Sequence, residues 1–524
     1  MVVVLVLALV WGAVPVRCAD EAGAKPKLVL AVVIDQFRYD YLTRFRADYH
    51  AGLARLLNEG AVYTEAHYVH YPTITAVGHS TFLTGATPSL SGIIGNDWYD
   101  RASGKVVTSV SDEATKLLGG TTGAVGASPR RLLVSTFPDE LKIAAPGGPK
   151  ATRVIGISIK DRAAILPAGH MADAAYWFDD KTNHFVTSDY YVSELPTWVK
   201  AANEAGPAAK FRDAVWMPLN ARADDKPFCT LATGGAVRPC GSIEASPFGN
   251  ELVEEFAEKA VANEQLGRHA GTDVLTVSFS SNDYVGHRVG PDDPAVRDIS
   301  IRTDIALGKL IDFIDAQIGK GKTLVVLTAD HGVAPVPEVN AARRMPGGRI
   351  DTKLVTGEVN QALVKRFGEG KWILSSAGEG IYLDYETAAN NKADLREVRR
   401  VAADAARTIP HVARVFTREE LLANGFAADL VAQAVVRGFY GPRSADITLV
   451  QEPYYLFGGS SGTSHSTPYS YDNHVPVIFY GAGVKAGVYR RRIAPNDIAP
   501  TLASMFDVET PSGAFGEALR EVVP

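Results

Sequence analysis

Five runs of apolar, largely β-branched residues divide the chain, and each is long enough for one strand: KLVLAVVID (27–35), TRVIGISIK (152–160), DVLTVSFSS (273–281), TLVVLTAD (323–330) and VPVIFYG (475–481). Continuous rather than alternating hydrophobicity is typical of parallel strands that helices cover on both faces. Residues 300–319, between two of these runs, have the apolar spacing of a helix. The sequence therefore predicts an α/β fold with a mostly parallel central sheet sandwiched by helices.

Two long segments interrupt the alternation of strands and helices. Residues 163–250 are rich in Trp, Tyr, Pro and Gly, and residues 334–460 carry only short helical patterns. Both are expected to be cap segments inserted into the core. Residues 25–524 are therefore expected to form one domain whose core is discontinuous in sequence, with the functional site between core and insertions.

The N-terminus has the layout of a secretory signal peptide. The apolar run MVVVLVLALVWGAVPV is too short to span a bilayer comfortably, and polar residues follow it. Cleavage after Cys18 or Ala24 would satisfy the small-residue rule, so residues 1–24 are predicted to be removed. The mature protein is then expected to be periplasmic or secreted, with no stable membrane anchor. A buried first strand is the weaker alternative, because residues 28–35 already fill that role.

The cysteines suggest one disulfide, and the net charge limits the possible binding partners. Of three cysteines, Cys18 leaves with the signal peptide, and Cys229 and Cys240 flank the turn-rich TLATGGAVRP. In an oxidising compartment this pair is a candidate disulfide, and its spacing excludes a CxxC-type zinc site. The net charge of −6 provides no basic surface for a nucleic-acid partner.

Acidic residues stand where three of the predicted strands end, and two of them bring a histidine. These residues are Asp35, Asp283 with His287, and Asp330 with His331. The carboxyl ends of parallel strands meet at one edge of a sheet, which is where ligands bind. A single strand-end Asp often only caps a helix, but three carboxylates brought together repel one another unless a cation lies between them.

The ligand types and their spacing predict two metal ions. Carboxylate and imidazole together suit Zn, Mn or Fe, whereas Mg and Ca favour oxygen ligands. Asp283 and His287 lie one helical turn apart and could bind one ion together. The adjacent Asp330 and His331 could share a second ion with Asp35 if the chain turns after them, as the following glycine permits. A two-metal site can hold the attacking and leaving oxygens of a displacement.

The first ion still needs a ligand, and SGTSHSTPYSYDNHVP offers His465 or His474 just before the last strand. A candidate nucleophile lies in YPTITAVGHSTFLTG (71–85), where an extended segment gives way to a helix near Ala76. There Thr75 could cap the helix, or it could be an alkoxide whose pKa a metal lowers. Thr73 is predicted to be structural, and His79 to pack or form hydrogen bonds within the helix.

Three further polar residues suit an anionic substrate. Asn96 lies in a turn of GIIGNDWYD, where its amide could donate to a phosphoryl oxygen. Lys160 and Arg162 lie two apart at the end of a strand, so they are expected to point the same way. In isolation such a pair is usually solvated surface, but beside two metal ions it would bind a dianion.

With these motifs in this order, the chain resembles the alkaline phosphatase superfamily. More narrowly it is similar to the phosphate-irrepressible periplasmic alkaline phosphatases, which use threonine and are related to nucleotide pyrophosphatases/phosphodiesterases. The resemblance runs from LVLAVVIDQFRYDYL to DIAPTLASMF, nearly the whole mature chain. It implies an alkaline phosphatase-like catalytic domain with two Zn²⁺ per chain and a lysine where the three-metal enzymes place magnesium.

The resemblance also assigns roles. It implies Thr75 as the nucleophile and places the phosphoryl oxygens on Asn96, Lys160 and Arg162. One zinc would be held by Asp283, His287 and His465, and the other by Asp35, Asp330 and His331. His465 is preferred over His474 because it occupies the family position, although Ser466 follows it where the family commonly has glycine.

The expected activity is hydrolysis of small phosphate monoesters to alcohol and inorganic phosphate through a phosphothreonine intermediate, by a chain that could act as a monomer. A phosphodiesterase or nucleotide pyrophosphatase of the same superfamily is the nearest alternative. A sulfatase is weaker, because no CxPxR-type motif is present. A metal-dependent phosphate-binding protein without turnover would lack a ligand or the nucleophile, and none is missing.

Overall fold

The centre of the sheet consists of four parallel neighbours. A computed structural model describes residues 25–234, 237–377, 379–426 and 428–523, so the predicted signal peptide lies outside the described residues. The four neighbours are β13 (Thr323–Thr328), β1 (Leu28–Ile34), β12 (Asp273–Phe279) and β7 (Val154–Ser158). All four were predicted from their continuous apolar runs. The predicted α/β fold with a mostly parallel central sheet is thereby confirmed.

The fifth predicted strand runs the other way. β20 (Val477–Gly481) pairs antiparallel with β13, with Val477 opposite Thr328. It therefore begins at the edge where the parallel strands end. Residues 465–475, which lead into β20, consequently lie beside the strand-end aspartates. If β20 were parallel, these residues would lie at the opposite edge of the sheet.

Further strands extend the sheet to eleven in the order β21-β2-β20-β13-β1-β12-β7-β8-β9-β5-β6. Their bounds are Gly487–Ile493 (β21), Ala61–Ala66 (β2), Ala174–Asp179 (β8), His184–Ser188 (β9), Ser111–Leu118 (β5) and Val125–Ala127 (β6). β8 and β9 come from the segment 163–250, which was expected to be an insertion. β8 continues the parallel ladder next to β7, so this part of the segment belongs to the central sheet. The residues of the segment that follow β9 lie outside the sheet.

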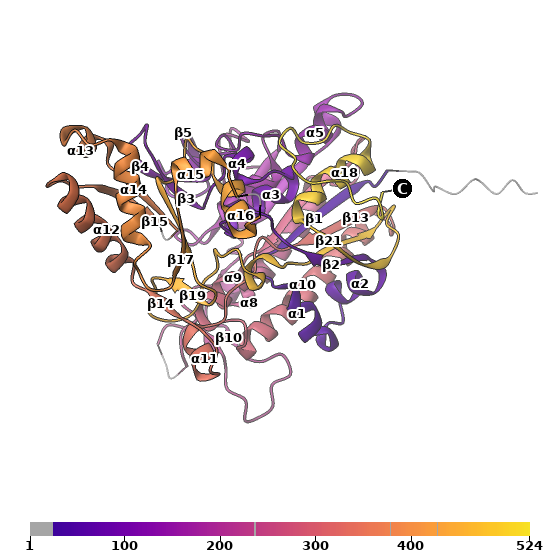
Figure 1. Cartoon of the computed structure of the whole chain (residues 1–524). Coiled ribbons are helices and arrows are strands. Elements are labelled where there is room, and N and C mark those ends of the chain that lie inside the picture. Colours follow the sequence, from indigo (N-terminus) through magenta and orange to yellow (C-terminus); the bar gives the residue numbers. More distant parts are fainter. Residues whose placement is uncertain (1–24, 235–236, 378, 427, 524) are drawn as a thin grey trace, which may run out of the picture.

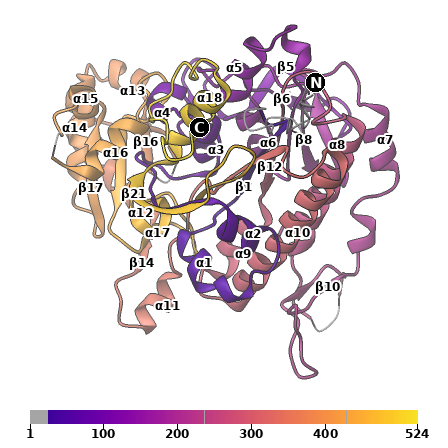
Figure 2. The same cartoon turned by 90° about the vertical axis from the view of Figure 1, so that its right-hand side faces the viewer.

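Helices cover both faces of the sheet, as expected for buried parallel strands (Figures 1 and 2). Alternate residues of β1 divide between the two faces: Leu30 and Val32 pack in one core cluster, and Val29 and Ala31 in the other. The first face carries α2 (Gly52–Glu59), α8 (Pro247–Asn263) and α10 (Pro294–Ile318), which begins six residues before the predicted helix 300–319 and ends one residue before its end. The second carries α3 (Thr75–Thr84), α5 (Phe137–Ile143) and α18 (Ile498–Phe506).

A smaller α+β unit forms most of the segment 334–460 (Figure 1). Its four-stranded sheet has the order β15 (Ile373–Ala377), β16 (Gly380–Leu383), β18 (Ile447–Gln451) and β17 (Val412–Thr417). Helices α12 (Thr352–Phe367) and α14 (Leu395–Ala406) pack on it through their own core, which includes Leu363, Ala402 and Leu449. This cap unit is therefore stabilised by hydrophobic burial of its own.

The remaining elements are short. The helices are α1 (Tyr39–Arg44), α4 (Pro88–Ser91), α6 (Asp161–Ala168), α7 (Thr197–Glu204), α9 (Ser281–Val289), α11 (Pro337–Ala342), α13 (Tyr385–Asn390), α15 (Arg418–Ala423), α16 (Leu430–Gly438) and α17 (Ser470–Asn473). The paired strands are β3 (Asp97–Asp100) with β4 (Lys105–Thr108), β10 (Val215–Trp216) with β11 (Cys229–Thr230), and β14 (Gly348–Ile350) with β19 (Tyr455–Phe457). None of the helices in the described part of the chain combines the length and apolarity needed to cross a bilayer.

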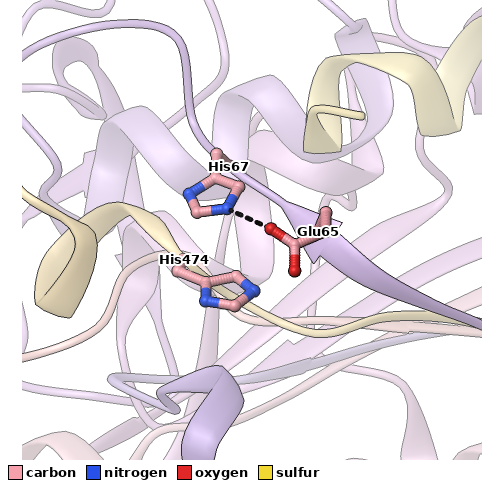
Figure 3. Close-up of side chains that lie close together, drawn as sticks. All are labelled: Glu65, His67 and His474. Carbon is pink, nitrogen blue, oxygen red and sulfur yellow. Dashed lines mark hydrogen bonds and ion pairs between the residues drawn. The ribbon is translucent and has the colours of Figure 1, made fainter. Parts of the chain in front are cut away.

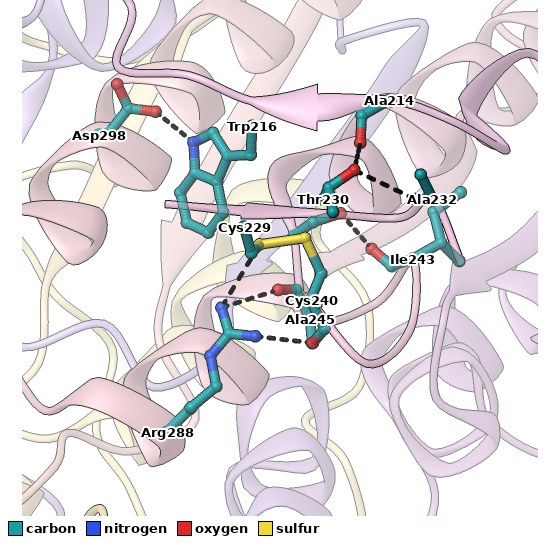
Figure 4. Close-up of a disulfide and its surroundings, with 11 residues drawn as sticks. Ala214, Trp216, Cys229, Thr230, Ala232, Cys240, Ile243, Ala245, Arg288 and Asp298 are labelled. Carbon is teal, nitrogen blue, oxygen red and sulfur yellow. Dashed lines mark hydrogen bonds between the residues drawn. A yellow bond between two sulfur atoms is a disulfide. The ribbon is translucent and has the colours of Figure 1, made fainter. Parts of the chain in front are cut away.

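A disulfide joins Cys229 to Cys240 beside the β10–β11 hairpin (Figure 4). Arg288 lies against this loop and donates to the carbonyl oxygens of Cys240, at 2.6 Å, and of Ala245, at 3.3 Å. Because Arg288 follows His287 in α9, the disulfide loop supports the helix that carries two of the predicted metal ligands.

Replacing both cysteines with serine should lower the free energy of unfolding by about 2–3 kcal/mol, because a short loop is no longer closed in the unfolded chain. Arg288 keeps its backbone acceptors, so catalytic rates should change little. Urea unfolding of wild type and of the double variant, each with and without reductant, measures the effect. Reductant should destabilise only the wild type, and equal stabilities without reductant would contradict the expectation.

Candidate metal centre

The six predicted ligands meet at the carboxyl edge of the sheet in two groups. Within each group, one ligand atom from every residue lies within 4.8 Å of the others. The first group is Asp35, Asp330 and His331, and the second is Asp283, His287 and His465. Residues more than 400 positions apart in sequence are thus brought together by the strand ends and by the segment before β20.

In the first group, the imidazole of His331 faces both carboxylates. Its Nε2 lies 3.5 Å from Asp35 Oδ1 and 3.4 Å from Asp330 Oδ2, and all three side chains are fully buried. Asp35 Oδ1 and Asp330 Oδ2 have no hydrogen-bond partner among the described residues. Burial, followed by the neighbouring charge of Asp330, raises the pKa of Asp35. Keeping both carboxylates ionised therefore requires positive charge between them.

Backbone carbonyls fix the tautomers of all three histidines. Each Nδ1 lies 2.8–2.9 Å from a carbonyl oxygen and must donate to it: His331 to Gly332, His287 to Thr463 and His465 to Thr73. In the neutral imidazole that binds metals, each Nε2 then carries the lone pair and lies near carboxylate oxygens, an arrangement that is repulsive without a cation and typical of metal ligands. Burial lowers the pKa of His331 and His465, which favours the neutral form that binds metals.

The turn after β13 lets adjacent Asp330 and His331 face one site. A Cβ on Gly332 would lie 2.2 Å from the carbonyl oxygen of Tyr471, so only glycine permits this close approach. The Gly332 amide also donates to the carbonyl of Asp472, at 2.7 Å. The chain thus turns directly after Asp330 and His331, which is what these adjacent residues need in order to face one site.

Thr75 is the first residue of α3 and is buried beside the first group. Its Oγ1 lies 3.5 Å from His331 Nε2 and caps no N–H of the helix. The helix can approach this closely because a Cβ on Gly78 would lie 2.1 Å from the carbonyl oxygen of Asp330. The hydroxyl therefore faces the candidate metal ligands, and the alternative that Thr75 only caps the helix is wrong.

The neighbouring residues of this segment have structural contacts, as predicted. Thr73 donates its hydroxyl to the carbonyl of Thr467, at 2.9 Å, and its own carbonyl accepts from His465. His79 donates from Nδ1 to the Thr75 carbonyl within the helix, at 2.9 Å, and its Nε2 lies 2.9 Å from Ser278 Oγ. His79 Nδ1 also lies 3.2 Å from Asp330 Oδ2, without forming a hydrogen bond to it.

Asn96 lies next to the start of α3. Its Oδ1 accepts from the Ala76 amide at 2.9 Å, so this N–H at the start of the helix is already bonded. The orientation leaves the Nδ2 hydrogens without a protein partner among the described residues, where they can donate to an anion. Asn96 also lines a pocket between the core and the cap unit, with Tyr71, Glu379 and Phe439. Burial raises the pKa of Glu379 to about 7.

Lys160 and Arg162 do not lie on one strand, because β7 ends at Ser158 and Arg162 already belongs to α6. Lys160 Nζ is buried between the two groups, 2.8 Å from Asp35 Oδ2 and 2.6 Å from Asp283 Oδ2. Arg162 is partly exposed, 3.6 Å from Asp161, and its Nε has no hydrogen-bond partner in the described part of the chain. The alternation of side chains along a strand, on which the expectation for Lys160 and Arg162 was based, therefore ends before residue 162.

Sequence reasoning missed Gln36, which follows Asp35 and is 2% exposed. Its side-chain Nε2 donates to Asp283 Oδ1 at 2.6 Å, and its backbone amide donates to Asp330 Oδ1 at 3.0 Å. It thus contacts one carboxylate of each group. Its only sequence signal is adjacency to a strand-end Asp, because the left-handed φ of 57° that directs the side chain cannot be read from residue type.

A third cluster, Glu65, His67 and His474, also brings possible ligands together (Figure 3). The two rings stack with centroids 4.2 Å apart and 13° between their planes, so their in-plane lone pairs do not converge. His474 Nε2 already donates to the Thr64 carbonyl at 2.9 Å. This cluster therefore lacks the free, convergent Nε2 atoms of the two buried groups, and His474 is not brought to the second group.

Comparison with known proteins identifies the family. The chain matches the type I phosphodiesterase / nucleotide pyrophosphatase family over residues 29–475, and it belongs to that family. Among its relatives, alkaline phosphatase PafA of Elizabethkingia meningoseptica is 36% identical over 96% of this chain and 95% of its own length. The crystal structure of wild-type PafA covers 96% of this chain and 100% of its own, with a TM-score of 0.89.

Two other relatives match at similar length. Alkaline phosphatase PhoV of Synechococcus elongatus is 34% identical over 96% of this chain and 94% of its own. A calcium-transporting ATPase of Myroides odoratus is 36% identical over 96% of each. The resemblance to the alkaline phosphatase superfamily is confirmed, and so is the prediction that the chain is an enzyme of the alkaline phosphatase class. Membership implies a metal cofactor, for which the two buried groups are the candidate ligands.

Proposed function

We propose that this chain hydrolyses phosphate monoesters with Thr75 as nucleophile beside two zinc ions, in the periplasm or outside the cell. The observation that carries the proposal is the arrangement of histidine Nε2 atoms against buried carboxylate oxygens, with the Thr75 hydroxyl 3.5 Å from His331 Nε2. One zinc would be held by Asp35, Asp330 and His331, and the other by Asp283, His287 and His465. When bound, the ions would supply the charge that stabilises an alkoxide and a leaving oxygen.

The chain's own residues then define the reaction. Thr75 releases its hydroxyl proton to solvent, its Oγ1 attacks phosphorus in line, the ester P–O bond breaks, and the alcohol departs with a proton from solvent. The phosphoryl group is left on Thr75. Water then attacks the same phosphorus and loses a proton, the bond to Thr75 Oγ1 breaks, that oxygen regains a proton, and inorganic phosphate is released. The Nδ2 hydrogens of Asn96 and the guanidinium of Arg162 would bind phosphoryl oxygens, because both groups have donors that no protein group among the described residues uses.

The contacts of Lys160 favour a role in balancing charge within the site, in addition to the substrate binding expected from the sequence. Because Nζ lies within 2.8 Å of Asp35 and of Asp283, its charge is shared with carboxylates of both groups. It therefore offsets the mutual repulsion of these carboxylates and leaves less charge for the substrate. The fork-like guanidinium of Arg162, which has only a distant partner in Asp161, is the better candidate to recognise a dianion.

The second candidate function is phosphodiester hydrolysis, which the name of the matched family favours. A diester carries one negative charge fewer than a monoester and a second substituent.

Arg162→Ala should therefore lower kcat/KM for p-nitrophenyl phosphate by about 10- to 100-fold, the value of a lost charge-assisted hydrogen bond. The loss for bis-p-nitrophenyl phosphate should be smaller.

The exposed cap arginine Arg366 provides a matched control, since Arg366→Ala should change neither rate. Wild type should prefer the monoester. A wild type that prefers the diester by a wide margin would overturn the proposed substrate, and equal losses for both esters in Arg162→Ala would show that Arg162 does not recognise the additional charge.

A further inference from the structure

Gln36 holds its two carboxylate partners by different means. The Asp330 contact uses its backbone amide, which every residue except proline retains, whereas the Asp283 contact depends on the side-chain amide. The left-handed backbone at residue 36 directs both donors toward the candidate metal groups. The side chain of Gln36 therefore acts on the second group alone.

The side-chain contact restricts the orientation of the Asp283 carboxylate. Gln36 Nε2 donates to Oδ1 at 2.6 Å, while Lys160 Nζ binds Oδ2 at 2.6 Å. Oδ1 is the oxygen that faces His287 Nε2, at 3.1 Å, and His465 Nε2, at 3.8 Å. With both oxygens bonded, the carboxylate cannot rotate, and Oδ1 stays turned toward the two imidazoles.

We infer that Gln36 is a positioning residue that orients Asp283 and thereby tunes metal affinity in the Asp283–His287–His465 group, without affecting the Asp35–Asp330–His331 group. The inference rests on the proposed two-metal function. Hydrogen bonds to a ligating carboxylate preorganise it, and losing such a partner typically costs about 10- to 100-fold in metal affinity. An asymmetric loss distinguishes positioning from a general role in stability.

The test uses the full chain freed of metal and titrated with Zn²⁺ in competition with a chromophoric chelator. Wild type should bind two zinc ions. Gln36→Met, an apolar residue of similar length, should weaken one dissociation constant by about 10- to 100-fold and leave the other unchanged. Gln36→Asn keeps an amide that is too short to reach Asp283 and tolerates the left-handed backbone, so it should give the same asymmetric loss if the Met variant folds poorly.

Gln451 provides a matched control, because it is another glutamine that is 2% exposed and its Oε1 has no hydrogen-bond partner in the described part of the chain. Gln451→Met in β18 should leave both zinc affinities at the wild-type values. If Gln36→Met and Gln36→Asn keep both wild-type affinities, or lose both equally, the inference is wrong. A wild type that binds no zinc would instead overturn the proposed function.

Discussion

Thr75→Ala should reduce phosphate monoester hydrolysis by about 10⁴-fold or more, because removal of a covalent nucleophile leaves only binding and electrostatic stabilisation. Thr75 Oγ1 lies 3.5 Å from His331 Nε2, but the six candidate ligands are held by shorter contacts to backbone carbonyls, Gln36 and Lys160. Zinc content and inorganic phosphate binding should therefore persist. Steady-state rates with p-nitrophenyl phosphate, metal analysis and phosphate binding measured on one preparation check the result.

Thr75→Ser is the matched control, because it keeps the hydroxyl and removes only a methyl group. It should retain covalent catalysis, although at a changed rate. Near wild-type turnover in Thr75→Ala would show that water attacks the ester directly, and would remove Thr75 from the mechanism. Loss of zinc in the same variant would mean that Thr75 supports the metal groups instead.

Removing the metal ions should abolish activity and lower thermal stability together. Asp35, Asp283 and Asp330 are buried at one sheet edge, and Lys160 is the nearest buried cation. Their repulsion is relieved by bound cations, and a site filled at about 1,000 times its dissociation constant adds roughly 4 kcal/mol to the free energy of unfolding. Dialysis against a chelator, followed by rate and melting measurements, tests this expectation.

Re-addition of Zn²⁺ should restore both activity and melting temperature. Mg²⁺ should not, because half of the six ligands are imidazoles and Mg²⁺ prefers oxygen. Full activity in metal-free protein would contradict the two-metal site. Complete recovery with Mg²⁺ alone would contradict zinc as the metal.

The strand ends and their aspartates could be predicted because both follow from local sequence. Continuous apolar runs specify buried parallel strands, and parallel strands deliver their carboxyl ends to one edge. The sequence therefore predicts that Asp35, Asp283 and Asp330 meet, and they lie within the two groups. The choice of His465 over His474 needed the family resemblance, since spacing alone left both open.

Other features depend on tertiary packing that spacing does not encode. The antiparallel direction of β20 depends on the return path of the chain through the cap unit. The sequence predicts that Lys160 and Arg162 share the end of one strand, but β7 ends two residues before Lys160 and a helix begins at once. Gln36 was missed because its contribution arises from one left-handed backbone angle.

The stereochemical course at phosphorus tests the central claim, attack by Thr75, most directly. Transfer from a chiral phosphate monoester to an alcohol acceptor should proceed with net retention, because two successive in-line displacements each invert the phosphorus centre. Net inversion would mean a single displacement, and would contradict a phosphothreonine intermediate.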